Sequence, residues 1–175
     1  MKKKIEDFTV KDALELAIQI ESQANERYAD FSRQIGSITK GDAGDFFATM
    51  AINESKHAHD LIVKYTELFG TYNPTIQIED YYEYMESEAP SFDRAESFMS
   101  TYSALIVARD SEIKAHTFYK KFSEVCKDQV VKAFFEELMH EEEEHRKMVE
   151  VELAKVNDGI SPLRNSDDID EPNGL

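Results

Sequence analysis

Two pairs of residues combine a carboxylate and an imidazole at a spacing that suits metal binding: Glu54-x-x-His57 and Glu142-x-x-His145. Residues three apart in an α-helix lie on one face, so each pair directs an oxygen and a ring nitrogen at the same point. Carboxylate and imidazole ligands suit iron or manganese, and no thiolate belongs to the set to favour zinc or copper.

Two further glutamates, Glu21 and Glu112, occupy positions where their helices should carry core residues. Burying an ionised carboxylate without a partner is strongly unfavourable, and no lysine or arginine shares these positions. Two divalent cations would cancel four negative charges, and two imidazoles would complete the coordination. The predicted metal ligands are Glu21, Glu54, His57, Glu112, Glu142 and His145.

Apolar residues recur at alternating steps of three and four in four segments, which predicts four helices. These span about residues 9–36, 43–69, 91–126 and 128–157. The residues that we expect to be buried beside the ligands are Val10, Leu14, Ala17, Ala24, Tyr28, Phe31, Ile35, Phe47, Met50, Leu61, Leu68, Phe98, Leu105, Ala108, Ala115, Tyr119, Phe122, Val131, Phe135, Leu138 and Val149.

The connections arrange these helices into two hairpins. Residues 37–45 form a short connection, whereas residues 70–90, bounded by Pro74 and Pro90, form the one long connection. We therefore predict an all-α four-helix bundle over residues 1–157. The polar, acidic residues 158–175 are interpreted as a flexible tail.

The two hairpins resemble each other. A shift of 91 positions relates the first helix to the third, with identities that include Glu21/Glu112 and Tyr28/Tyr119. A shift of 88 relates the second helix to the fourth and superimposes Glu54/Glu142 and His57/His145. Amphipathic helices share apolar positions by chance, but identical polar residues at the same core positions indicate a true repeat.

The repeat also separates inward from outward residues. In the run "EEEE" at 141–144 it selects Glu142 as the inward glutamate, with Glu143 and Glu144 on the surface and Glu141 at the edge of the stripe. A third pair, Glu137-x-x-His140, is out of phase with Leu138 and His145. We interpret this third pair as a surface coincidence.

Composition excludes several classes of function. A net charge of −16 disfavours binding to nucleic acids and to anionic membranes. The single cysteine, Cys126, excludes an internal disulfide and a four-thiolate iron site. No apolar run approaches the length of a membrane span, and no signal-peptide core follows the N-terminal lysines. We expect a cytoplasmic protein.

The sequence resembles the rubrerythrin-like branch of the ferritin-like superfamily. "ESQANERY" (21–28) is similar to the first-helix motif of that family, and "NESKHA" (53–58) and "EEEHRKM" (142–148) are similar to its Glu-x-x-His motifs. The resemblance implies a ferritin-like bundle whose long connection crosses between the second and third helices. It also implies catalysis through a dimetal centre, with Glu54 and Glu142 bridging and with Glu21, Glu112, His57 and His145 as terminal ligands. Tyr28 and Tyr119 would donate hydrogen bonds to ligand carboxylates.

Two departures from that family affect the expected chemistry. The four-cysteine rubredoxin-like domain of rubrerythrins is missing, so electrons would come from a separate donor protein. Ala115 stands where rubrerythrins place an additional carboxylate, three residues after Glu112. His116 could replace that carboxylate, but a structural role for His116 is favoured.

These observations favour an oxidoreductase with two Fe ions, or Mn or mixed Fe/Mn, that reacts with hydrogen peroxide or O2 in the response to oxidative stress. The partners expected are the oxidant, the electron donor and a second copy of the chain in a homodimer. One alternative is a ferroxidase or iron-storage protein. The other is a non-catalytic scaffold with vestigial ligands.

Overall fold

The computed structural model describes residues 4–36, 40–78 and 100–157. The predicted tail at 158–175, most of the long connection and residues 91–99 of the predicted third helix, with Phe98, lie outside the described residues.

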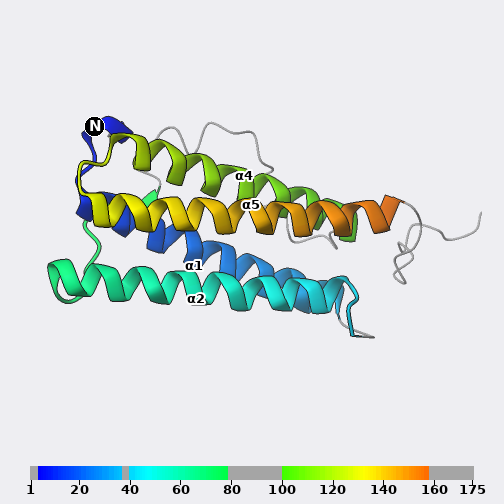
Figure 1. Cartoon of the computed structure of the whole chain (residues 1–175). Helices are drawn as coiled ribbons and strands as arrows, with labels where there is room; N and C mark the ends of the chain where they lie inside the picture. The colour runs from blue at the N-terminus through cyan, green and yellow to red at the C-terminus, as the bar shows by residue number, and fades with distance from the viewer. Residues whose placement is uncertain (1–3, 37–39, 79–99, 158–175) are drawn as a thin grey trace, which may run out of the picture.

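Four long helices form the bundle, preceded by a short 3₁₀ helix. Their bounds are η1 Ile5–Asp7, α1 Val10–Ile35, α2 Ala43–Phe69, α4 Thr101–Val125 and α5 Gln129–Asn157. Helices α1 and α2 pack against each other as one hairpin, and α4 and α5 pack as the second (Figure 1). The predicted all-α bundle of four helices in two hairpins is confirmed within the described residues. No helix in the described ranges is long and apolar enough to cross a membrane.

Local sequence signals begin and end these helices. Thr9 and Asp12 form a reciprocal capping box at the start of α1. Asp42 and Ser100 each accept a hydrogen bond from the backbone of the first turn that follows them. Gly36 ends α1 with φ of 73°, a conformation that glycine adopts without strain. These caps determine where α1, α2 and α4 begin and where α1 ends.

The buried residues form two apolar layers along the bundle axis. One layer contains Leu14, Leu61, Tyr119, Phe122 and Phe135 among others. The second layer is built by Tyr28, Phe31, Phe47, Leu105 and Val149 with their neighbours. The predicted ligand positions fall between these layers in the sequence of every helix. The core therefore encloses the polar residues from both sides.

Two details of the predicted helices are wrong. The third helix does not run unbroken from residue 91, because Ser100 is extended and its hydroxyl caps a helix that begins at Thr101. Leu68 was expected in the core but is 47% exposed, and Tyr65, one turn earlier, is buried instead. Tyr65 stands one full turn after Leu61 and stays in phase with the stripe, whereas Leu68 lies in the last turn of α2.

A buried carboxylate outside the predicted site holds the start of the long connection. Glu15 of α1 accepts hydrogen bonds from the Tyr65 hydroxyl at 3.0 Å and from the backbone amides of Thr75 and Ile76 at 2.6 and 3.2 Å. Gln19 bonds the same segment, donating to the Ile76 carbonyl and accepting from the Ile78 amide. These contacts attach residues 75–78 to α1.

Candidate metal centre

Each of the four long helices contributes to one buried polar cluster. Glu21 comes from α1, Glu54 and His57 from α2, Glu112 from α4, and Glu142 and His145 from α5. All six side chains are buried, and each is at most 6% exposed. The structure thus brings together every predicted ligand, although these residues span positions 21 to 145 of the chain.

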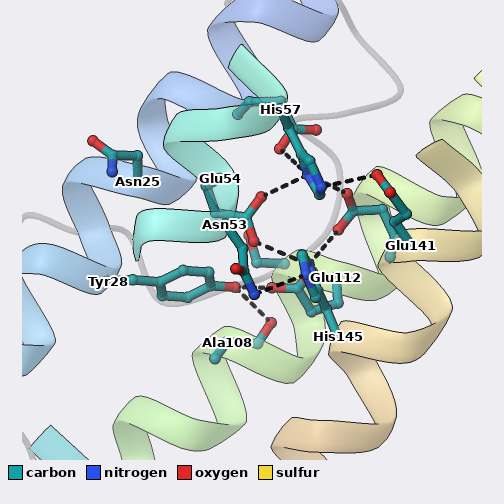
Figure 2. Close-up of polar contacts among 12 residues, drawn as sticks. Asn25, Tyr28, Asn53, Glu54, His57, Ala108, Glu112, Glu141 and His145 are labelled. Atoms are coloured by element: carbon teal, nitrogen blue, oxygen red, sulfur yellow. Dashed lines mark hydrogen bonds and ion pairs between the residues drawn. The ribbon is translucent and has the colours of Figure 1, made fainter. Parts of the chain in front are cut away.

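The two histidines point the same ring nitrogen, Nδ1, into the cluster (Figure 2). His57 Nδ1 lies 3.4 Å from an oxygen of Glu54 and 3.4 Å from an oxygen of Glu142. His145 Nδ1 lies 3.1 and 3.6 Å from oxygens of the same two glutamates. The two imidazole rings are nearly parallel, with centroids 5.2 Å apart.

Each of the remaining two carboxylates lies near one histidine. An oxygen of Glu21 lies 3.4 Å from His57 Nδ1, and an oxygen of Glu112 lies 3.7 Å from His145 Nδ1. Glu54 and Glu142 therefore lie between the two histidines, while Glu21 and Glu112 lie at opposite ends.

Four buried atoms in the cluster make no hydrogen bond within the described residues. They are Glu54 Oε1, His57 Nδ1, Glu142 Oε1 and His145 Nδ1. Buried polar atoms are nearly always satisfied, so four together require an explanation. Ligand atoms of these four residues lie within 4.8 Å of one another, as a shared cation would require. The residues present therefore fit a metal centre of carboxylate and imidazole donors.

Two tyrosines connect α1 and α4 across the cluster. The Tyr28 hydroxyl donates a hydrogen bond to Glu112 Oε1, and the Tyr119 hydroxyl donates to Glu21 Oε1. Both tyrosines are fully buried. Because each helix supplies the tyrosine that orients the glutamate of the other, the contacts follow the internal repeat. Their location is the one that the resemblance implies.

The four carboxylates differ in their affinity for protons. Burial raises the pKa of Glu21 well above its usual value, and repulsion from Glu142 and Glu54 raises it further. Burial and repulsion from Glu54 and Glu142 likewise raise the pKa of Glu112 well above its usual value. Burial alone would also raise the pKa values of Glu54 and Glu142, but contacts with the two histidines outweigh it and lower both.

The carboxylates also shift the pKa values of the two histidines, in the direction that favours the charged imidazolium form. Burial lowers the pKa of His145, but Glu112, Glu142 and Glu54 together outweigh it and raise the pKa to about 12. The pKa of His57 is raised by the same kind of contact. These shifts favour the protonated forms of Glu21, Glu112 and the two histidines and the ionised forms of Glu54 and Glu142. Such a distribution of protons reduces the net charge that is buried when no metal is bound.

The outer nitrogen, Nε2, of each histidine has a partner that the sequence did not reveal. Glu141 Oε2 lies 2.9 Å from His57 Nε2, and the Asn53 side-chain nitrogen lies 3.4 Å from His145 Nε2 (Figure 2). The repeat predicts Glu141 only at the edge of the buried stripe. These contacts cross between α2 and α5, so the periodicity of one helix cannot indicate them.

The other residues of the acidic run lie on the surface, as the repeat predicts. Glu143 pairs with Arg146, and Glu144 pairs with Lys147. Glu137 and His140 are exposed and line a shallow pocket above the two histidines. Their side chains lie outside the buried cluster, in agreement with their phase in the sequence.

Comparisons with known proteins identify a family and a similar fold. The sequence matches the family model named Rubrerythrin over residues 12–99 and 103–171. A search of curated proteins finds no match. The fold is similar to the crystal structure of an uncharacterised conserved protein from Magnetospirillum magnetotacticum MS-1, with a TM-score of 0.70 and 23% identity over 90% of this chain and 99% of that chain. Since the family model covers most of the sequence, the chain belongs to the rubrerythrin family.

Proposed function

We propose that this protein is a dimetal carboxylate oxidoreductase that binds two iron ions and reduces hydrogen peroxide, with O2 as a second oxidant. The observation that carries the proposal is the convergence of four buried, unsatisfied donor atoms from Glu54, His57, Glu142 and His145. Oxygen and imidazole donors suit iron, with manganese as the nearest competitor. Membership of the rubrerythrin family supports the same assignment.

The positions of the side chains suggest a role for each ligand. Glu54 and Glu142 each contact both histidines, so they would bridge the two ions. Glu21 and His57 would complete one ion, since they contact each other. By the repeat, Glu112 and His145 would complete the second.

The surrounding residues would keep this centre ordered and dry. A pair of ferrous ions would supply two electrons and become ferric, and with two protons from solvent these electrons would reduce one peroxide to two waters. Tyr28 and Tyr119 hold the terminal glutamates by hydrogen bonds, which limits the directions in which these carboxylates can move. The apolar layers shield the cluster from solvent in both directions along the bundle axis.

Electrons would come from another protein. Cys126 is the single cysteine, and a cysteine-ligated iron centre needs several thiolates. Since these 175 residues cannot form such a centre, the proposal includes an electron donor outside them, together with a homodimeric assembly.

The test is a stoichiometric titration. Protein loaded anaerobically with Fe(II) is mixed with hydrogen peroxide, and ferrous iron is measured with a chromogenic chelator. We expect one peroxide to oxidise two ferrous ions per chain, and turnover when a reductant is supplied. His145→Ala should abolish the reaction, whereas His140→Ala, an exposed histidine above the same site, should not.

Other outcomes would assign the protein to a different class. Continued uptake of many ferric ions per chain, with a large cage in light scattering, would identify an iron-storage protein. Bound iron that peroxide leaves ferrous would contradict the proposed reaction. A protein that binds no metal would be a scaffold with vestigial ligands.

A further inference from the structure

Asn53 and Glu141 are equivalent positions in the internal repeat. The shift of 88 residues that superimposes Glu54 on Glu142 and His57 on His145 also superimposes Asn53 on Glu141. Each of the two residues directly precedes a predicted bridging glutamate. Each contacts the histidine of the opposite hairpin: Asn53 reaches His145, and Glu141 reaches His57.

The six predicted ligands obey the repeat, but these two partners do not. The predicted ligands pair as identical residues, whereas the outer partners are an amide and a carboxylate. Both Nδ1 atoms point into the cluster, so a metal-bound histidine carries its proton on Nε2. His57 can then donate that proton to an anion at 2.9 Å, while His145 faces a neutral side chain at 3.4 Å.

This difference has a chemical consequence. A carboxylate that accepts the outer N–H of a metal-bound histidine makes the imidazole a stronger electron donor and fixes its orientation. The Asn53 atom nearest to His145 Nε2 is the amide nitrogen, which is itself a donor, so it cannot accept that proton and gives His145 no comparable support. Resting on the proposed dimetal function, we propose that Glu141 and Asn53 are positioning residues that make the two metal positions unequal. The ion beside His57 is held more tightly than the ion beside His145.

The magnitude is limited by solvent. Removal of an outer partner typically weakens metal binding by about 10- to 100-fold. The Glu141 side chain is 41% exposed and lines the pocket above the histidines, so water screens part of its charge. We therefore expect an effect near the lower limit, about 10-fold.

The experiment titrates full-length metal-free protein with Co(II) under argon and follows binding by calorimetry. The wild type should show two binding events of unequal affinity. Glu141→Gln should weaken the tighter event about 10-fold and bring the two together. Asn53→Asp should instead strengthen the weaker event. Glu137→Gln is the matched control, because it removes the same charge from the same pocket one turn away.

A second measurement assigns the effects to individual histidines. Proton NMR of the Co(II)-loaded protein reports the exchangeable imidazole N–H protons next to the paramagnetic ions. Glu141→Gln should shift one of these signals, and Asn53→Asp should shift the other. Shifts of both signals by either variant would contradict separate positioning roles.

The outcomes separate this inference from the proposed function. If the wild type and Glu137→Gln bind two ions and Glu141→Gln behaves like them, the positioning role is wrong and the dimetal site stands. If the wild type binds no Co(II), Fe(II) or Mn(II), the dimetal site itself is wrong and the inference falls with it.

Discussion

Metal binding should release about four protons per chain at pH 7. In the metal-free cluster His57 and His145 carry one proton each, since contact with the carboxylates raises both of their pKa values. We expect Glu21 and Glu112 to carry one each as well, because burial and repulsion from Glu54 and Glu142 raise their pKa values. Two divalent ions require all four groups to lose these protons.

The charge balance explains why this exchange is favourable. Before binding, two histidinium ions and the ionised Glu54 and Glu142 give 2 − 2 = 0. After binding, four carboxylates and two divalent ions give −4 + 4 = 0. The buried volume therefore stays neutral while four protons leave and two cations enter. With two protons released for each ion, affinity should rise about 100-fold per ion for each unit of pH.

Calorimetry in buffers of different ionisation enthalpy measures this directly. The slope of the observed enthalpy against the buffer enthalpy gives the number of protons released, and a slope near four is expected. A slope near two would show that Glu21 and Glu112 are already ionised in the metal-free protein. A slope near zero would refute the charge assignment altogether.

Three further predictions concern residues around the centre. Glu15→Gln should destabilise the protein by about 2 kcal/mol at pH 7, measured by urea unfolding, without changing metal content. Hydrogen bonds outweigh burial and lower the pKa of Glu15. The stability that Glu15 contributes is therefore present above about pH 4.5 and is lost as the pH falls through its folded-state pKa. A difference in unfolding free energy between variant and wild type that stays constant down to pH 2 would contradict this. Tyr119→Phe removes the donor to Glu21 and should cost about 1–2 kcal/mol in the metal-free protein while two ions still bind; loss of the metal would show a larger role. Leu61→Ala should destabilise by about 2–5 kcal/mol, whereas Leu68→Ala should change stability by less than about 0.5 kcal/mol, and equal effects would contradict the observed exposure of Leu68.

Helical periodicity and the internal repeat were sufficient to predict the fold and the composition of the cluster. Periodicity determines which face of a helix is inward, and a charged residue on that face needs a partner. Glu21 shows this well, since a carboxylate among Ala17, Ala24 and Tyr28 needs a partner and a ligand role supplies one. The repeat then excluded Glu143 and Glu144 from the cluster, in agreement with the structure.

Periodicity cannot indicate contacts that depend on where two helices cross. Glu141 contacts His57 because α5 lies beside α2 at this position along the bundle. The contact between Asn53 and His145 depends on the same pairing of helices. Glu15 was missed because its partners, Thr75 and Ile76, lie in a segment without regular spacing.

The sequence pattern also could not predict where the buried part of a helix ends or where a helix begins. An apolar stripe does not indicate whether neighbouring helices continue alongside it. Leu68 was therefore predicted to be a core residue, although it is exposed. The start of α4 depends on the capping hydroxyl of Ser100, which a continuous stripe conceals.

The most direct test of the dimetal centre is the metal content of protein purified anaerobically and incubated with Fe(II), measured by plasma mass spectrometry. Glu142→Ala removes a carboxylate that is 1% exposed and lies between both histidines, and Glu144→Ala removes one from the surface of the same helix. We expect two iron ions per chain in the wild type and in Glu144→Ala, and fewer than one in Glu142→Ala. Equal iron content in all three proteins, or folded wild-type protein that retains no iron, would contradict a dimetal centre at this site.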